Sequence, residues 1–181
     1  MQRTVTGPAD LSQEALADLK GWLGISRSRE DALLTDLLAA SLAICEGFTG
    51  QTPLEHVIAL TVPAEPGWQC LAARPVRGLE AVEHVAPDGA RVAVPDEEHT
   101  FRIEADGTAR LAVQGSSDSS MIAVTVRAGI APDWAQLPAA LKQGIIRLAA
   151  FHYRDRESGR DATPPASVTA LWRPWRVMRL T

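Results

Sequence analysis

Apolar residues recur at helical spacing in the first fifty residues of the chain. Residues 12–23 carry leucines at intervals of three and four, and Ser12 stands where an N-cap residue would. A wider apolar stripe runs through residues 28–48, and Gly47 and Gly50 mark its end. Because only a few residues connect the two segments, we predict an antiparallel helical hairpin.

A third helical pattern begins at Pro138, a residue suited to the first turn of a helix. Apolar side chains then share one face: Leu141, Ile145, Leu148 and His152. Gly144 lies inside this pattern, where glycine costs about 1 kcal/mol relative to alanine. Its presence indicates either close packing of another backbone or simple tolerance.

Between these helices, in residues 53–130, apolar and polar side chains alternate with a period of two. Short alternating runs are separated by turn sequences such as Pro87-Asp88-Gly89 and Ala105-Asp106-Gly107-Thr108. The pattern predicts a meander of about six short strands, in which one face of the sheet is packed and the other is exposed to solvent.

The predicted fold class is therefore α+β. The N-terminal helical hairpin and the long C-terminal helix would form a helical bundle, with an antiparallel β-meander inserted and an extended arm at the C-terminus. The expected boundaries are 1–52 for the N-terminal helices, 53–130 for the β subdomain, 131–160 for the long helix and 161–181 for the arm.

Charge is distributed unevenly along these 181 residues. The formal net charge is -4, yet residues 139–181 hold eight basic and only three acidic side chains. An acidic body argues against a nucleic-acid-binding domain, because phosphate contacts need clustered lysine and arginine. The basic end indicates partners that recognise charge, unless the asymmetry is a random feature of the surface.

Motifs of nucleophilic, metal-dependent or nucleotide-binding enzymes do not occur in the sequence. We therefore predict no enzyme activity, no cofactor and no metal. Cys45 and Cys70 have no zinc-type spacing, and we expect two buried thiols in a reducing cytoplasm. The sequence predicts neither a signal peptide nor a membrane span.

The C-terminal segment alternates large apolar and cationic side chains around Pro174. Tryptophan and arginine are the residues most enriched at binding hot spots. Three interpretations stay open: the segment docks into a neighbouring protein, folds back onto its own domain, or binds nucleic acid through phosphate contacts and stacking. The residues are Trp172, Trp175, Met178 and Leu180, with Arg173, Arg176 and Arg179 between them.

Residues 124–157 resemble the phage head–tail connector (adaptor) family. A strand ends at Gly129, a Pro-opened helix carries Lys142-Gln143, and the helix finishes at Tyr153-x-x-Arg156-Glu157. The acidic helix start at residues 30–34, the EGFTG sequence at 46–50 and the closing LWRPWRVMRL also resemble the family. The likeness is greatest to the long, strand-containing members of siphophages and alphaproteobacterial gene transfer agents. Two departures are Gly144, where alanine is usual, and Arg154-Asp155, where Glu-Asn is more usual.

The resemblance implies a structural subunit of a ring, with twelve copies expected. The ring would join the portal protein to the tail of a tailed phage or gene transfer agent and line the DNA exit channel. DNA would pass through without sequence-specific binding, a further neck component such as a stopper would follow, and no membrane would be involved. The expected location is the neck of the particle, assembled in the bacterial cytoplasm. A soluble regulatory or nucleic-acid-binding module is the alternative, followed by an enzyme of unknown class.

The same resemblance assigns roles to two sets of residues. The expected portal-binding arm is Leu171, Trp172, Arg173, Pro174, Trp175, Arg176, Val177, Met178, Arg179 and Leu180. The expected contacts between the helices of neighbouring subunits are Lys142, Gln143, Arg147, Tyr153 and Arg156.

Overall fold

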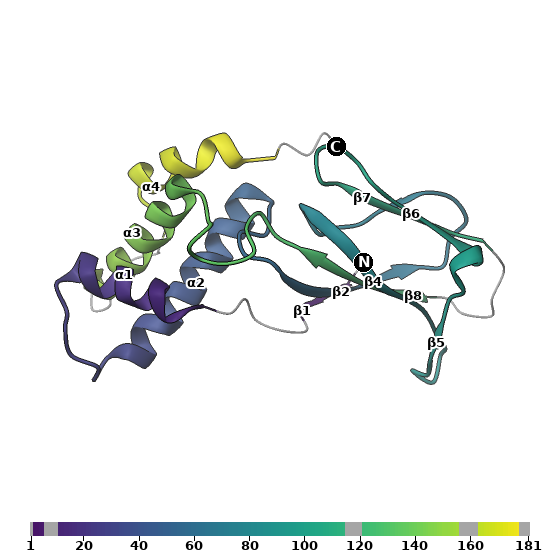
Figure 1. Ribbon diagram of the computed structural model, residues 1–181, viewed down its shortest axis with the longest axis horizontal. Coiled ribbons are helices and arrows are strands. Elements are labelled where there is room, and N and C mark those ends of the chain that lie inside the picture. The colour runs from purple at the N-terminus through teal and green to yellow at the C-terminus, as the bar shows by residue number, and fades with distance from the viewer. Residues whose placement is uncertain (1, 6–10, 115–120, 156–162, 178–181) are drawn as a thin grey trace. The chain divides into compact units, whose positions relative to one another are not determined.

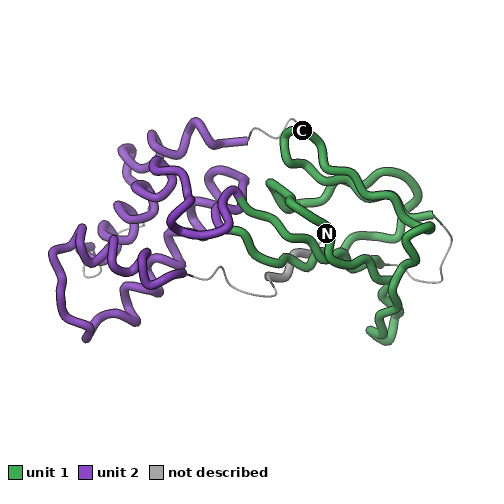
Figure 2. The backbone as a smooth tube through the Cα atoms, in the orientation of Figure 1, with its two compact units in different colours: residues 1–9, 55–129 green, residues 10–54, 130–181 purple. Residues whose placement is uncertain are grey.

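The computed structural model describes the backbone of residues 2–5 and the whole of residues 11–114, 121–155 and 163–177. The chain divides into two compact units, drawn in green and purple in Figure 2. Unit 1 comprises residues 1–9 and 55–129, and unit 2 comprises residues 10–54 and 130–181. Residues 55–129 of unit 1 are therefore inserted in the sequence of unit 2, and residues 1–9 precede it.

Unit 1 is built from two antiparallel sheets (Figure 1). The larger has the order β1-β2-β8-β4-β5, and the smaller has the order β3-β7-β6. The strands are β1 (Gln2–Val5), β2 (His56–Pro63), β3 (Gln69–Cys70), β4 (Val76–Val85), β5 (Arg91–Ala93), β6 (His99–Ile103), β7 (Ala109–Val113) and β8 (Met121–Ala128), with the 3-10 turn η1 (Asp96–Glu98) before β6.

Strand β8 lies in the centre of the larger sheet, although it is the last of these strands in the chain. It pairs along its length with β2 on one side and β4 on the other. The topology is therefore not the simple meander predicted, in which neighbours in sequence pair in order. Alternate positions of β2 and β8 contribute Ile58, Leu60 and Val124 to a core shared with Leu111 of the smaller sheet. Both sheets thus bury one face against the same apolar cluster.

The described residues of unit 2 form four helices: α1 (Gln13–Leu23), α2 (Asp31–Thr49), α3 (Ala139–Asp155) and α4 (Ala166–Trp172), followed by the 3-10 turn η2 (Arg173–Trp175). Helix α3 contacts each of the other three. Its central place follows from its sequence, because Leu141, Ile145 and Leu148 on the predicted face are fully buried. Gly24 and Gly50 end α1 and α2 in the left-handed conformation, which glycine adopts without steric cost.

The two cysteines differ in environment. Cys45 is buried in α2, as predicted, but Cys70 is exposed in the short strand β3. The expectation of a buried Cys70 is wrong: the next residue, Leu71, joins the shared core, and neighbouring residues of an extended chain face opposite sides.

Candidate interaction surfaces of the helical unit

Trp172 is fully buried in unit 2, at the C-terminal end of α4. Its indole Nε1 donates a hydrogen bond to the carbonyl oxygen of Leu141, at 3.4 Å. The ring packs against Gly144 of α3 and lies 6.0 Å from the ring of Phe48 between centroids. The expectation of an extended arm that offers Trp172 to a partner is therefore wrong. Residues 166–175 are helical, and the ring completes the core of its own unit.

The chain after Trp172 stays on the same unit as far as the structure describes it. The backbone N–H of Val177 donates to the carbonyl oxygen of Thr49 at 2.9 Å, and the side-chain amide of Gln51 donates to the carbonyl oxygen of Trp175. Of the arm residues proposed from sequence, Leu171, Trp175 and Val177 are half-buried, whereas Met178, Arg179 and Leu180 lie outside the described residues.

Within the described part of the predicted arm, three residues are exposed: Arg173, Pro174 and Arg176, which we call the basic turn. The guanidinium of Arg176 lies 5.6 Å above the ring of Phe48, which holds this cation at the surface of unit 2. The basic turn is thus presented by a folded helix end rather than by a free chain.

The predicted subunit-contact residues have different surroundings. The Tyr153 hydroxyl donates to Glu30 at 2.8 Å, and Lys142 Nζ contacts the carbonyl oxygen of Ala135 at 3.3 Å. Both side chains therefore contribute to the fold of their own unit. Gln143 is half-buried, Arg147 is exposed, and Arg156 lies outside the described residues.

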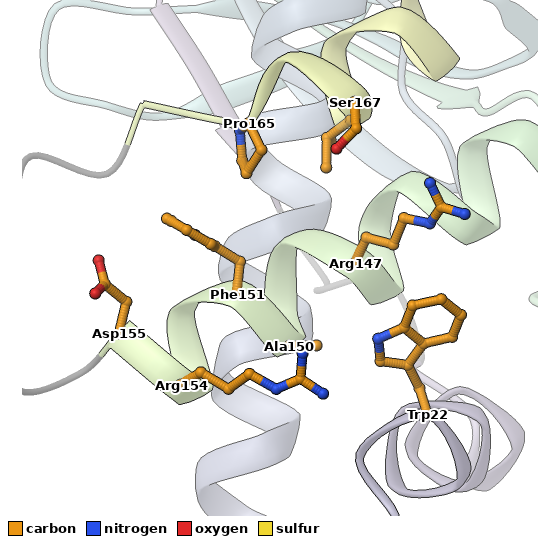
Figure 3. Close-up of a pocket in the computed structure, with 9 residues that line it drawn as sticks. Trp22, Arg147, Ala150, Phe151, Arg154, Asp155, Pro165 and Ser167 are labelled. Atoms are coloured by element: carbon orange, nitrogen blue, oxygen red, sulfur yellow. The ribbon is translucent and has the colours of Figure 1, made fainter.

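Arg147 borders a groove of about 550 Å³ between α1, α3 and α4 (Figure 3). Its guanidinium lies 5.5 Å above the ring of Trp22, which is 44% exposed. Phe151 is 36% exposed and lies one helical turn beyond Arg147 on α3, and Arg154 follows on the same side. The groove is lined by Trp22, Arg147, Ala150, Phe151, Arg154, Asp155, Pro165, Ser167 and Val168. We call it the aromatic groove.

Sequence reasoning missed Trp22 and Phe151. Each is an aromatic residue beside exposed cationic or polar positions of an amphipathic helix, rather than on its buried face. An aromatic residue on the polar side of an amphipathic helix could have indicated this surface, because exposed aromatic residues next to arginine are typical of binding surfaces.

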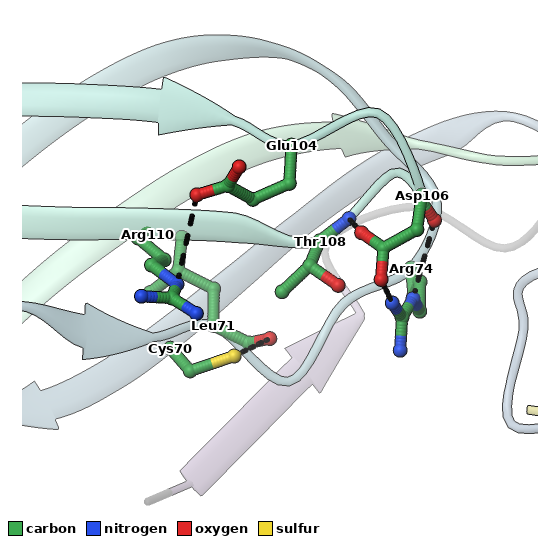
Figure 4. A network of polar contacts seen from close by, with 7 residues as sticks. All are labelled: Cys70, Leu71, Arg74, Glu104, Asp106, Thr108 and Arg110. Carbon is green, nitrogen blue, oxygen red and sulfur yellow. Dashed lines mark hydrogen bonds and ion pairs between the residues drawn. The ribbon is translucent and has the colours of Figure 1, made fainter. Parts of the chain in front are cut away.

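One network of polar contacts in unit 1 surrounds the turn between β6 and β7 (Figure 4). Asp106, between β6 and β7, accepts a hydrogen bond from the backbone N–H of Thr108 at 2.9 Å and pairs with Arg74. The backbone hydrogen bond is the first cause that lowers the pKa of Asp106, followed by the Thr108 side chain and Arg74. Among the described residues, no group of three or more His, Cys, Asp or Glu side chains is placed to hold a metal ion.

No family model and no curated protein matches the sequence. Solved structures do match: a chain in the neck of an empty GTA particle, computed with C6 symmetry, has a TM-score of 0.82 and 24% identity. That match covers 100% of this chain and 98% of the other. The chain has the fold of a gene transfer agent neck protein.

Two further structures agree with this assignment. A chain in the virion of a native gene transfer agent particle has a TM-score of 0.78 and 25% identity. A chain in the neck of the native particle, computed with C12 symmetry, has a TM-score of 0.80 and 24% identity. Both matches cover 100% of this chain and 98% of the other chain. The resemblance to gene transfer agent adaptors that the sequence indicated is thus confirmed for the fold, and it extends over both units.

Proposed function

We propose that this chain is a structural head–tail adaptor subunit. It forms a ring, with twelve copies expected, that joins the portal protein to the tail in the neck of a tailed phage or gene transfer agent particle. It contributes the wall of the channel through which DNA leaves, and it catalyses no reaction. The full-length match to chains of the gene transfer agent neck and virion carries this proposal.

The distribution of charge supports the same role. The chain is acidic apart from its C-terminal end, and fixed cations along a channel would hold DNA phosphates through counterion release. An acidic wall lets DNA pass without being retained. The symmetry of the matched necks, C6 and C12, is consistent with a subunit present in many copies around an axis.

The basic turn is the best candidate for the portal contact. Arg173 and Arg176 are exposed at the end of a helix whose position is set by the buried Trp172. Arginines placed in this way pair with carboxylates of a partner without first ordering a free chain.

Co-purification with the portal protein of the same particle tests this function. We expect the wild-type chain to be retained by the portal as a ring, and the Arg173→Glu/Arg176→Glu variant to lose at least about tenfold in retention, or 1.4 kcal/mol. Arg27→Glu/Arg29→Glu is the matched control, because it also reverses two exposed arginines of unit 2. Equal retention of both variants would exclude the basic turn as the portal contact. A wild-type chain that neither forms rings nor binds portal would contradict the adaptor function itself.

A further inference from the structure

Helix α2 is much more apolar than its burial within the chain requires. Only five of its 19 residues are buried, and its charged residues are Asp31, Asp36 and Glu46. By length and composition it is the one described helix that could cross a membrane, although apolar core helices of water-soluble proteins have the same character. Among the described residues of unit 2, most positions of α2 therefore stay partly or fully exposed.

The uncovered surface forms one continuous face. Opposite the buried side of α2 lie small exposed residues, with Asp36 as the one charged residue among them, and larger apolar residues border them. We call this surface the α2 face. It comprises Ala32, Asp36, Ala39, Ala40, Ala43 and Gly47, bordered by Leu33, Leu37 and Ile44.

The aromatic groove lies on the other side of α3 from α2. Helix α3 packs against α2 through one side and presents Arg147, Phe151 and Arg154 on the other. Figure 3 shows these side chains in front of α3, with the α2 ribbon behind it. Unit 2 therefore carries two different surfaces on opposite sides. One is an apolar helix face with one carboxylate, and the other is a groove with exposed aromatic rings, two guanidinium groups and the carboxylate of Asp155.

We propose that the α2 face of one copy docks into the aromatic groove of the next copy. The inference rests on the proposed ring and names the surfaces that build it. Small residues on α2 let the helix approach the groove closely, Trp22 and Phe151 cover its apolar side chains, and Asp36 meets the cations Arg147 and Arg154. Because the two surfaces differ, contact is head-to-tail and each copy keeps one free surface for the next. Such a contact builds a ring when the rotation between neighbouring copies closes.

Charge complementarity favours a second copy over a lipid surface as the occupant. The Asp36 carboxylate on the α2 face is unfavourable in a bilayer, whereas it complements a groove whose two arginines outnumber its one carboxylate, Asp155. Flotation with neutral and with anionic vesicles measures the membrane alternative directly. We expect no flotation, and binding that Asp36→Leu strengthens would overturn the assignment.

Disulfide trapping tests which surfaces meet. In a Cys70→Ser background, which removes the exposed thiol, one chain carries Ala40→Cys on the α2 face and another carries Ser167→Cys at the groove. We expect mild oxidation to give dimers when the two chains are mixed and little product from either alone. A chain with both substitutions should give a ladder of dimers, trimers and larger species. Ala90→Cys, at an exposed position of unit 1, is the control and measures how much disulfide forms by random collision between chains. Predominant Ala40→Cys homodimers, or a mixture no more reactive than this control, would overturn the proposal.

Charge reversal tests the energetics by sedimentation. We expect Asp36→Arg and Arg154→Asp each to weaken self-association about tenfold, and their combination in one chain to recover most of the loss. Glu97→Arg, an exposed reversal in unit 1, is the control and should leave association unchanged. If rings form in the presence of portal but are indifferent to these changes, the pairing of surfaces is wrong and the adaptor function stands. If no ring forms under any condition, the adaptor function is wrong as well.

Discussion

The indole ring of Trp172 occupies the space that a side chain at position 144 would fill. A Cβ atom on Gly144 would lie within 2.8 Å of three atoms of that ring, closer than real Cβ atoms approach. The glycine in the middle of α3 is thus required by α4, and the helix-propensity cost of Gly144 is offset by burial of a tryptophan. Close packing, one of the two interpretations open from sequence, is the correct one, although the partner is a side chain rather than a backbone.

Gly144→Ala should destabilise the protein despite improving the propensity of α3. The gain in propensity is about 1 kcal/mol, whereas overlap with a buried ring costs more because the indole cannot move without disturbing α4. We expect a net loss of about 1 to 3 kcal/mol in the free energy of unfolding, measured by urea denaturation. Gly21→Ala in α1, where a Cβ would meet nothing within 4 Å, is the control and should be neutral or stabilising.

Trp172→Ala should disrupt the fold of unit 2 rather than only its binding. Removing a fully buried tryptophan costs about 3 to 5 kcal/mol, because a cavity remains between α2, α3 and α4. Thermal unfolding and circular dichroism would measure this loss. Arg173→Ala, one residue further on and exposed, should change stability by less than about 0.5 kcal/mol. A Trp172→Ala variant as stable as wild type would place the ring outside the core.

The two thiols should react at very different rates. Burial, with a smaller contribution from the neighbouring Glu46, raises the pKa of Cys45 to about 12, so its reactive thiolate is scarce at pH 8. Cys70 is exposed. We expect an aromatic disulfide reagent to modify Cys70 rapidly in the native protein, and Cys45 only after denaturant is added. Rapid modification of both thiols without denaturant would contradict the buried position of Cys45.

The buried indole of Trp134 depends on Asp18 as its hydrogen-bond acceptor. Trp134 is 1% exposed, and its Nε1 donates to Asp18 Oδ2 at 2.9 Å across from α1. Asp18→Ala leaves this donor without its partner and should cost about 1 to 3 kcal/mol of stability. In a Trp134→Phe background the same substitution should cost distinctly less, and the double-mutant cycle measures the coupling. Equal costs in the two backgrounds would show that the hydrogen bond contributes nothing.

Local structure was largely predictable from the sequence, because the hydrophobic period reports which face of an element is buried. The patterns at 12–23 and 28–48 correspond to α1 and α2, and the α+β class is confirmed. Strand pairing was not predictable, because alternation in β8 shows that one face is buried but not which strands are its neighbours. Its place between β2 and β4 is set by contacts distant in sequence.

The candidate sites also combine features that local sequence patterns indicate with contacts between distant residues that they do not. Arg147 was selected from a resemblance and lies at an exposed groove, but its ring partner Trp22 is 125 residues away in sequence and no local pattern connects them. For Trp172, the sequence left open whether the ring docks into a neighbour, folds back onto its own domain or binds nucleic acid. Its burial depends on a gap in α3 that only the folded chain reveals.

The route of the chain between its two units has a consequence for engineering. Leu54 and Ala131, which flank the inserted β unit, are joined by a parallel bridge, so the points of departure and return lie one strand spacing apart. A loop of a few residues could close that distance in place of residues 55–129. A foreign domain grafted at the same two points would then be attached at both of its ends to each copy of the helical unit, and it could be exchanged for another.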